Sequence, residues 1–224
     1  MKSILMIWDI DGTLINPKGT GRSAMNKAFL YAYGIHNAFD DIEMSGRLDA
    51  IIVKDAFNKH HIADQDIQLF YDAYCNMLRI IVDKEKIIET LPGVKNILDT
   101  KQDYEIIHTL GTGNMKDGAR IKLEAQDLNK YFSTGGFGDE GLQRWEIILK
   151  AIEEAEKCTQ IKFDKDDIYV IGDTPLDIEC GKILGIKTIA VATGSHSYEE
   201  LFQHDPDFIF KTLENTAEFF KIFS

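Results

Sequence analysis

Two pairs of aspartates are spaced so that the members of each pair can act on the same atom or ion. Asp9 and Asp11 lie two positions apart, directly after the apolar run 4–8, and Asp173 and Asp177 follow a later apolar run. Four carboxylates at one site would repel each other strongly unless a cation lay among them. Carboxylate oxygens favour a hard ion, and Mg²⁺ suits such a site because it also binds the phosphate oxygens of substrates. These residues therefore predict a magnesium site that can receive a phosphate.

A third polar cluster, Thr112-Gly113-Asn114, follows another apolar run and stands at the expected start of a helix. Its hydroxyl group and its free backbone N–H groups can bind an anion. An isolated Asp-x-Asp is as often a helix cap or a turn, so one pair of aspartates alone would predict little. Three such clusters after three similar apolar runs favour one shared functional site.

The apolar runs are the elements that must position these clusters. Each is followed by small or polar residues, and they lie at 4–8, 105–110, 167–171 and 187–192. A continuous apolar run is typical of a strand that is buried on both faces of a parallel sheet. Amphipathic helical stretches, among them 115–128 and 146–157, separate the runs, so we predict an α/β fold with a doubly wound, Rossmann-like parallel sheet. Ligands bind at the carboxyl ends of such strands, where the three clusters would meet.

The alternation of strands and helices fails between the first strand and about residue 89. That segment contains only helical patterns, at 24–33, 49–60 and 67–82, and Pro92-Gly93 marks the return to alternation. We therefore predict a core domain of residues 1–15 and 90–224 with an inserted α-helical cap of residues 16–89. The end of the chain predicts a helix, a short strand and a last helix that complete the sheet.

Composition and charge exclude several classes of partner. Of the 224 residues, 44% are hydrophobic and 28% are charged, which is typical of a globular protein rather than a disordered one. With 25 Lys and Arg against 37 Asp and Glu, the net charge of −12 disfavours nucleic acid and anionic membrane surfaces as partners. The first apolar run is too short for a signal peptide, and no later run could span a membrane. The three cysteines are widely spaced and lack C-x-x-C, which favours the reducing cytoplasm.

In full, the three clusters are Asp9-Ile10-Asp11-Gly12-Thr13-Leu14, Thr112-Gly113-Asn114 and Gly172-Asp173-Thr174-Pro175-Leu176-Asp177. They resemble, in the same order, motifs one, two and four of the haloacid dehalogenase superfamily. The helical insertion after the first motif is similar to the cap of that superfamily, so the resemblance covers nearly the whole chain, with phosphoglycolate-phosphatase-like members as the most similar branch. It implies a Mg²⁺-dependent phosphatase that hydrolyses a small phosphorylated metabolite through an aspartyl-phosphate.

The resemblance also implies a role for each residue of the clusters. Asp9 would be the nucleophile, and Asp11 would protonate the leaving group and later deprotonate the attacking water. Asp173 would bind Mg²⁺ together with Asp9 and the backbone carbonyl group of Asp11. Asp177 would act on the metal through a water or would orient a basic residue. The phosphoryl oxygens would be held by Thr112, Gly113 and Asn114.

The third motif of the superfamily, a Lys that is often followed by Pro, has no direct match. Arg144 lies at about the expected distance and could pair bidentately with phosphate or carboxylate, so it is the first candidate for the phosphate-binding cation. Lys122, one helix earlier, is the alternative. Either residue could instead be a solvated cation on a helix surface.

The predicted cap contains Ser45-Gly46-Arg47-Leu48-Asp49, which resembles the specificity loop of phosphoglycolate-phosphatase-type members, with Leu48 where Thr is common. Gly46, Arg47 and Asp49 are therefore candidate specificity residues. Arg47 could bind a substrate anion or could be an exposed loop residue. The glycine-containing segment 18–22 is the expected hinge of the cap.

One further pattern, Gly136-Phe137-Gly138-Asp139-Glu140-Gly141, matches the G-x-G-x-x-G of dinucleotide-binding proteins. It follows no clear apolar strand, and Asp139 and Glu140 would place negative charge where a pyrophosphate needs N–H donors. We therefore predict no dinucleotide site here.

Other activities of the superfamily fit the sequence less well. A dehalogenase needs neither a second aspartate like Asp11 nor a metal, and a phosphonatase needs a cap lysine, for which Lys54 and Lys59 have no supporting context. A phosphosugar mutase is an alternative, with Arg47 as the residue for a second phosphate. A non-catalytic sensor of phosphorylated ligands is another, because a fold alone does not define a function. Sugar phosphates, phosphoglycolate and nucleotides all stay open as substrates.

Overall fold

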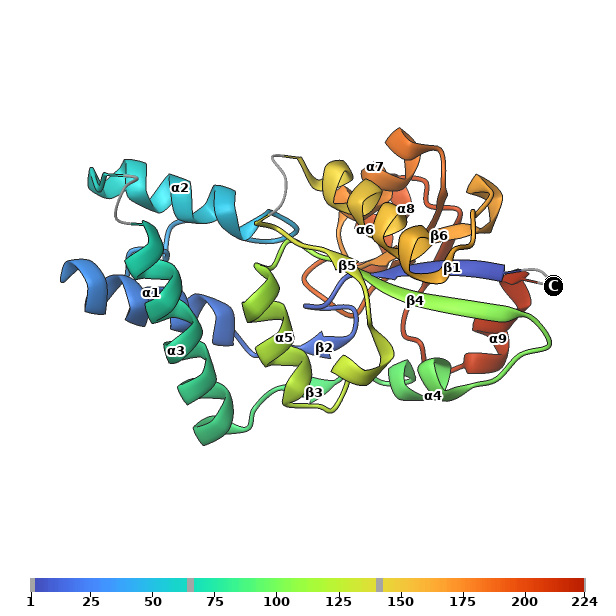
Figure 1. The fold of residues 1–224 in the computed structure, drawn as a ribbon, viewed down its shortest axis with the longest axis horizontal. Helices are drawn as coiled ribbons and strands as arrows, with labels where there is room; N and C mark the ends of the chain where they lie inside the picture. Colours follow the sequence, from blue (N-terminus) through green and yellow to red (C-terminus); the bar gives the residue numbers. More distant parts are fainter. Residues whose placement is uncertain (1–2, 64–66, 140–142, 224) are drawn as a thin grey trace.

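A six-stranded parallel sheet lies at the centre of the chain (Figure 1). The computed structural model describes residues 3–63, 67–139 and 143–223. The order of the strands is β5-β4-β1-β6-β7-β8. Their bounds are Ser3–Trp8 (β1), Glu105–Gly111 (β4), Gly135–Gly136 (β5), Ile168–Gly172 (β6), Lys187–Val191 (β7) and Phe208–Phe210 (β8). The chain reverses its direction across the sheet at β1, and doubly wound sheets bind ligands outside the carboxyl ends of the strands at such a position.

The central strand β1 is buried on both faces, which explains its unbroken apolar sequence. Ile4, Met6 and Trp8 point to one face and belong to the larger hydrophobic cluster, whereas Leu5 and Ile7 point to the other. Successive side chains of a strand alternate between faces, so only a fully apolar run can satisfy a strand that is covered on both sides.

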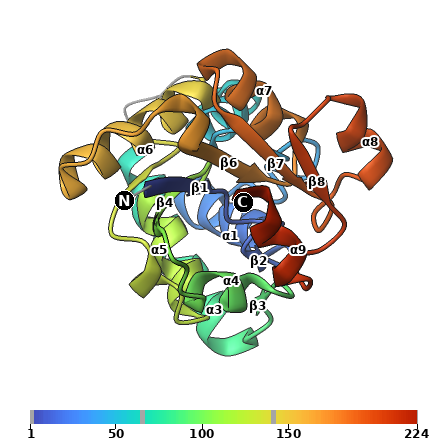
Figure 2. The same cartoon turned by 90° about the vertical axis from the view of Figure 1, so that its right-hand side faces the viewer.

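Helices cover both faces of the sheet (Figure 2). On the face of Leu5 and Ile7 the cluster includes residues of α6 and α7, and on the opposite face it includes residues of α4, α5 and α9. The helices of this part of the chain are α4 (Val94–Asp99), α5 (Lys116–Glu124), α6 (Arg144–Thr159), α7 (Pro175–Leu184), α8 (Tyr198–Gln203) and α9 (Thr216–Phe220). Short 3₁₀ helices cover Asn129–Tyr131, Lys165–Asp167 and Lys221–Phe223.

Three helices follow the first strand and lie beyond the carboxyl ends of the sheet strands (Figure 1). These cap helices are α1 (Thr20–Tyr33), α2 (Asp49–His60) and α3 (Ile67–Glu85). Their interior is aromatic, because the rings of Phe29, Phe57 and Phe70 meet edge to face with centroids 5.7–6.2 Å apart. The chain enters and leaves the cap helices through the antiparallel strands β2 (Ile15–Asn16) and β3 (Glu89–Thr90), so both ends of the insertion are joined at one place.

The predicted α/β class is confirmed, and the four apolar runs form β1, β4, β6 and β7. The three helical patterns of the insertion form α1, α2 and α3, and the end of the chain forms α8, β8 and α9. The division into a core of residues 1–15 and 90–224 and a cap of residues 16–89 stays a proposal, which the β2–β3 pair supports.

Some elements were not predicted. The strand β5 consists of two glycines, which carry no apolar pattern, and it exists because Leu110 and Gly111 of β4 pair with it. The strands β2 and β3 are too short to show a period, and they form through tertiary pairing at the edges of the helical segment. Helix α5 is shorter than the predicted 115–128, since it ends at Glu124 and Asp127 adopts φ 57°. Among the described residues, no helix is both long and apolar enough to cross a membrane.

Candidate active site

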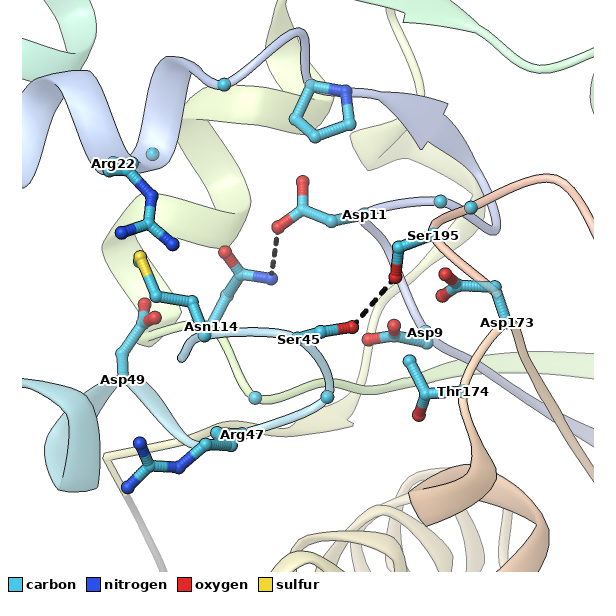
Figure 3. Close-up of a pocket in the computed structure, with 18 of the residues that line it drawn as sticks. Asp9, Asp11, Arg22, Ser45, Arg47, Asp49, Asn114, Asp173, Thr174 and Ser195 are labelled. Carbon is cyan, nitrogen blue, oxygen red and sulfur yellow. Dashed lines mark hydrogen bonds between the residues drawn. The ribbon is translucent and has the colours of Figure 1, made fainter. Parts of the chain in front are cut away.

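The segments that follow β1, β4 and β6 meet at one edge of the sheet and line a cavity of about 490 Å³. The cavity lies between these segments and the cap helices, and residues from both line it (Figure 3). Nearly all of the candidate site residues are among the lining residues: Asp9, Asp11, Gly46, Arg47, Asp49, Gly113, Asn114, Lys122, Arg144 and Asp173. Thr112 and Asp177 lie directly behind that surface and contact lining residues.

The loop after β1 brings its two aspartates to the edge of the sheet through a tight turn. The N–H group of Asp9 still donates to the carbonyl group of Ile171 in β6, at 2.9 Å, so Asp9 continues the strand pairing. Gly12 then adopts φ +84°, and a Cβ at this position would lie 2.5 Å from Oδ2 of Asp173. Only glycine fits this turn, because any other residue would be strained in its backbone and would collide with a site carboxylate.

Three buried carboxylates form the centre of the site. One oxygen each of Asp9, Asp173 and Asp177 lies within 4.8 Å of the others. Burial raises the pKa of Asp9 to about 6, although the positive charge of Arg144 opposes this shift. Burial and the negative charges of Asp9 and Asp177 also raise the pKa of Asp173 well above its ordinary value. This excess of buried negative charge, with oxygen donors only, fits a hard divalent cation.

The chain beside Asp173 runs so close to its carboxylate that position 194 accepts only glycine. A Cβ on Gly194, in the loop after β7, would lie 1.6 Å from Oδ2 of Asp173. Backbone from the loops after β1 and β7 therefore encloses this carboxylate. Its only hydrogen bond among the described residues is a long one from the hydroxyl group of Thr13, at 3.4 Å, so most of its acceptor capacity is left for a ligand.

Arg144, the first residue of α6, joins two of the three carboxylates. Its Nε and Nη2 atoms donate to Oδ1 of Asp177 at 2.9 and 2.6 Å, and Nη2 lies 3.1 Å from Oδ1 of Asp9. Burial alone would lower the pKa of Arg144, but the carboxylates of Asp177 and Asp9 raise it, so the guanidinium group stays charged. Asp177 uses its other oxygen, Oδ2, to cap α7 by accepting from the N–H and hydroxyl groups of Thr174. Both oxygens of Asp177 are therefore occupied, which suits the orientation of Arg144 better than direct metal ligation.

Lys122 lies at a different place from Arg144. Its ammonium group is 2.5 Å from Oδ2 of Asp11 and 2.6 Å from Oδ1 of Asn114. The amide group of Asn114 donates to the same oxygen of Asp11, at 3.0 Å, and to the hydroxyl group of Thr112, at 2.8 Å (Figure 3 shows the Asn114–Asp11 bond). The two candidate cations thus serve different aspartates, Arg144 the first and Lys122 the second.

The loop before α2 and the first residue of α2 contact the core through four hydrogen bonds. The N–H group of Asp49 donates to the carbonyl group of Gly113 at 2.7 Å, and Oδ2 of Asp49 accepts from the N–H group of Met115 at 2.9 Å. The carbonyl group of Gly46 accepts from Nη1 of Arg144 at 3.1 Å, and the hydroxyl groups of Ser45 and Ser195 are 2.9 Å apart (Figure 3). Burial raises the pKa of Asp49 to about 6. The segment 45–49 therefore holds the segment 112–115 from the cap side.

Two arginines of the cap line the cavity but are bound to other groups. The guanidinium group of Arg47 pairs with Asp55 at 2.6 Å and donates to the carbonyl group of Glu43 at 2.9 Å, and it points away from Asp9 (Figure 3). Arg22 donates to three backbone carbonyl groups, those of Phe39, Asp40 and Ile42. Both arginines therefore support the shape of the cap loop.

Part of the cavity lining is apolar. The apolar lining residues are Met25, Met44, Ile52, Pro17 and Tyr74. The hydroxyl group of Tyr74 is buried and has no hydrogen-bond partner among the described residues. An unpaired buried hydroxyl group is costly, so this atom is suited to meet a polar group of a ligand.

The G-x-G-x-x-G pattern serves packing. A Cβ on Gly136 would lie 2.0 Å from the carbonyl oxygen of Ile147, and one on Gly138 would lie 1.9 Å from that of Gly113. These glycines let α6 and the segment 112–114 approach the chain closely. The last two residues of the pattern, Glu140 and Gly141, lie outside the described residues.

The fold is a parallel sheet covered by helices, and buried carboxylates gather at the ends of β1 and β6. A family model described as haloacid dehalogenase-like hydrolase matches residues 6–191. The chain belongs to this family, and the predicted resemblance is confirmed.

Curated and solved proteins of similar length align with nearly the whole chain. The pyrophosphatase PpaX of Halalkalibacterium halodurans is 24% identical over 95% of this chain and 94% of its own. A candidate phosphoglycolate phosphatase from Haemophilus somnus has a similar structure, with a TM-score of 0.71 and 17% identity over 98% of this chain and 99% of its own. A candidate β-phosphoglucomutase from Thermotoga maritima has a TM-score of 0.64 and 18% identity over the same shares. These structural likenesses show the shared fold.

Sequence reasoning missed several residues of the site. Gly194 and Ser195 follow β7, and the rule that strand ends carry the site would have included them, but their types carry no distinctive chemistry. Tyr74 lies in the middle of a helical pattern, where an aromatic residue predicts only packing.

Proposed function

We propose that the protein is a Mg²⁺-dependent phosphatase that hydrolyses a small phosphomonoester through an aspartyl-phosphate intermediate. The observation that carries this proposal is the placement of Asp9 at the tip of the central strand, with Arg144 3.1 Å from its carboxylate and Asp173 beside it. A carboxylate held between a cation and a divalent-ion site is suited to attack phosphorus.

In the first step, an oxygen of Asp9 forms a bond to phosphorus while the bond from phosphorus to the ester oxygen breaks. Asp11 gives its proton to that oxygen, and an alcohol leaves. In the second step, Asp11 takes a proton from a water whose oxygen bonds to phosphorus, and the bond to Asp9 breaks, which releases inorganic phosphate. One carboxyl group can make both proton transfers only if it lies beside the leaving group. Asp11 meets this requirement because it lines the cavity two residues after Asp9.

Asp9, Asp173 and the backbone carbonyl group of Asp11 would hold the metal, with Asp177 acting through Arg144. When bound, Mg²⁺ supplies charge neutralisation for the carboxylates and for the phosphate. Arg144 would bind a phosphoryl oxygen as well as Asp9, because its guanidinium group lies at the cavity surface. The N–H groups of Gly113 and Asn114, which begin the segment before α5, would bind further phosphoryl oxygens. Thr112 would support them from behind through its contact with Asn114.

The cavity limits the substrate to a small phosphorylated metabolite. A volume of about 490 Å³ must hold both the phosphate and the leaving group. The net charge of −12 argues against nucleic acid polymers and anionic membranes as partners. The three cysteines are free, which suits a reducing cytoplasm.

The test is release of phosphate from p-nitrophenyl phosphate and from a panel of glycerol phosphate, hexose phosphates, phosphoglycolate, nucleoside monophosphates and pyrophosphate. Pyrophosphate belongs in the panel because the PpaX relative is a pyrophosphatase. We expect turnover that requires Mg²⁺, stops with EDTA and is lost in Asp9→Asn. Melting temperatures of both proteins control for folding. A folded wild type that binds these compounds but releases no phosphate would contradict the proposal and favour a sensor.

A phosphosugar mutase is the second candidate, because a structural neighbour is a candidate β-phosphoglucomutase. A mutase must hold two phosphates, and Arg47 is the cap cation that the sequence predicts for the second. Its guanidinium group is bound to Asp55 and to the carbonyl group of Glu43, which disfavours this role. Isomerisation of a hexose phosphate without net release of phosphate would favour the mutase.

A further inference from the structure

Lys122 places a buried ammonium group on the second aspartate of the site. The residue lies on α5, and its side chain is only 4% exposed. Gly118 and Lys122 are spaced by four in α5, so they lie on the same face of this helix. The ammonium group reaches both Oδ2 of Asp11 and Oδ1 of Asn114, at 2.5 and 2.6 Å. Helix α1 covers the ammonium group of Lys122, since a Cβ on Gly21 would lie 3.4 Å from Nζ.

Stability does not explain this arrangement. A buried ion pair loses hydration that its mutual attraction often only balances, and an apolar side chain of similar size often stabilises a fold as well. In the proposed function the phosphate-binding cation is already Arg144, which contacts Asp9 and Asp177. A second buried cation that is directed to Asp11 therefore requires another reason.

We propose that Lys122 is a positioning residue for the acid–base carboxyl group of Asp11. With Asn114, it holds Asp11 through Oδ2 alone. The other oxygen, Oδ1, is buried and has no hydrogen-bond partner among the residues that the structure describes. One oxygen of the carboxyl group is thus anchored, and the other is left to exchange a proton with the leaving group and then with water. This inference rests on the proposed phosphatase function, in which Asp11 is the acid and base.

A positioning role affects only steps in which Asp11 moves a proton. An alkyl ester needs a proton on its leaving oxygen, whereas 4-nitrophenolate leaves as a stable anion. The value of kcat/KM reports the step in which the ester bond breaks, so it separates the two kinds of substrate. We expect Lys122→Met to lower kcat/KM for the best alkyl monoester of the panel by about 100-fold, the lower range of general-acid effects. We expect the kcat/KM for p-nitrophenyl phosphate to fall by less than about threefold, because no proton is needed there.

Lys116→Met, at the exposed start of the same helix, is the matched control and should change neither value. Should Lys122→Met fail to fold, Lys122→Gln provides the same comparison with a neutral donor. Partial recovery of alkyl ester hydrolysis in Lys122→Ala by added ethylammonium would support a role for the positive charge at this place.

An equal loss of kcat/KM on both substrates, or no loss on either, would overturn the inference and leave the phosphatase standing. A wild type that hydrolyses p-nitrophenyl phosphate but no alkyl ester would also overturn it, because leaving-group protonation would then play no part. Absence of Asp9-dependent turnover in the wild type would instead overturn the proposed function, and the inference with it.

Discussion

Nη2 of Arg144 lies 3.1 Å from Oδ1 of Asp9, and the same atom donates to Asp177 at 2.6 Å. One guanidinium group therefore ties the strand end of β1 to the start of α7. The fork of the guanidinium group allows this, because Nε and Nη2 share Asp177 while Nη2 also reaches Asp9 and Nη1 holds Gly46 of the cap loop.

We expect Arg144→Lys to lose activity almost as severely as Arg144→Met, with kcat/KM for p-nitrophenyl phosphate reduced by about 100- to 1,000-fold. A lysine ammonium group keeps the charge but cannot contact Asp177, Asp9 and Gly46 at once. Steady-state kinetics measure the effect, and Arg79→Met, an exposed arginine on α3, is the control. Near wild-type activity of Arg144→Lys would show that charge alone suffices at this position.

Removal of divalent metal should make the stability of the protein fall as the pH rises. Burial raises the pKa of Asp9 to about 6 in the folded chain, above about 3.9 in an unfolded one, so the folded state binds more protons between these values. In EDTA, the unfolding free energy should therefore decrease from about pH 4 to above pH 6, by about 2–3 kcal/mol for this group. Mg²⁺ should raise the melting temperature more at pH 8 than at pH 5, because ionised carboxylates bind it.

Calorimetry with and without Mg²⁺ at both pH values measures this dependence. In Asp9→Asn, the unfolding free energy in EDTA should depend less on pH. At pH 8, the metal-free variant should be more stable than the metal-free wild type. Equal stabilisation by Mg²⁺ at pH 5 and pH 8 would contradict a metal site built from these carboxylates.

The docking of the cap loop through Asp49 should contribute to both stability and binding. Asp49→Ala leaves the buried N–H group of Met115 without its acceptor, which should lower the unfolding free energy by about 1–3 kcal/mol. Met115 directly follows Gly113 and Asn114, so losing this contact should loosen that segment, and we expect KM to rise by about tenfold while kcat changes little. Asp49→Asn keeps an acceptor oxygen and should have a smaller effect on both.

Denaturant unfolding and steady-state kinetics measure these effects, and Asp83→Ala, at an exposed position of α3, is the control. A fall in kcat with an unchanged KM in Asp49→Ala would show a direct part in the chemistry instead of a part in docking.

His108 should make the fold sensitive to acid. Its Nδ1 atom accepts from the indole N–H group of Trp8 at 3.0 Å, and burial lowers the pKa of His108 to about 4. The unfolded chain takes up this proton at about pH 6.5, so stability is present above that pH and is lost as the pH falls towards 4. The contribution should be about 2 kcal/mol, less than the full shift because the ring is only partly buried.

His108→Gln keeps an acceptor for Trp8 and cannot take up a proton. The unfolding free energy of this variant should fall less than that of the wild type between pH 6.5 and pH 4. Denaturant unfolding at both pH values measures the difference, and parallel curves would show that His108 does not titrate with unfolding.

Much of the fold could be predicted because β1, β4, β6 and β7 are buried strands whose apolar runs are unambiguous. The elements that were missed have no such local pattern. Gly135 and Gly136 become a strand only because β4 pairs with them, and β2 and β3 exist only because the ends of the cap segment meet. Pairing between residues distant in the chain leaves no periodic pattern in either segment.

The candidate site divides in the same way. The positions of Asp9, Asp11 and Asp173 directly after strands correctly predicted that these residues line the cavity. The sequence did not predict which residues Arg144 and Lys122 contact. Arg144 and Lys122 were alternatives for one role, and their contacts show that each serves a different aspartate. Arg47, predicted as a candidate specificity residue, has its guanidinium group on Asp55.

The sequence by itself determined the order of strands and helices and the types of side chain at each strand end, because burial on two faces and helix periodicity are local properties of the chain. Only the tertiary structure decided which charges meet. Long cationic side chains reach several ångströms from their backbone, and the partner that each finds depends on how helices of the core and of the cap pack together. The assignment of Lys122 to Asp11 and of Arg144 to Asp9 and Asp177 is therefore a property of the folded chain.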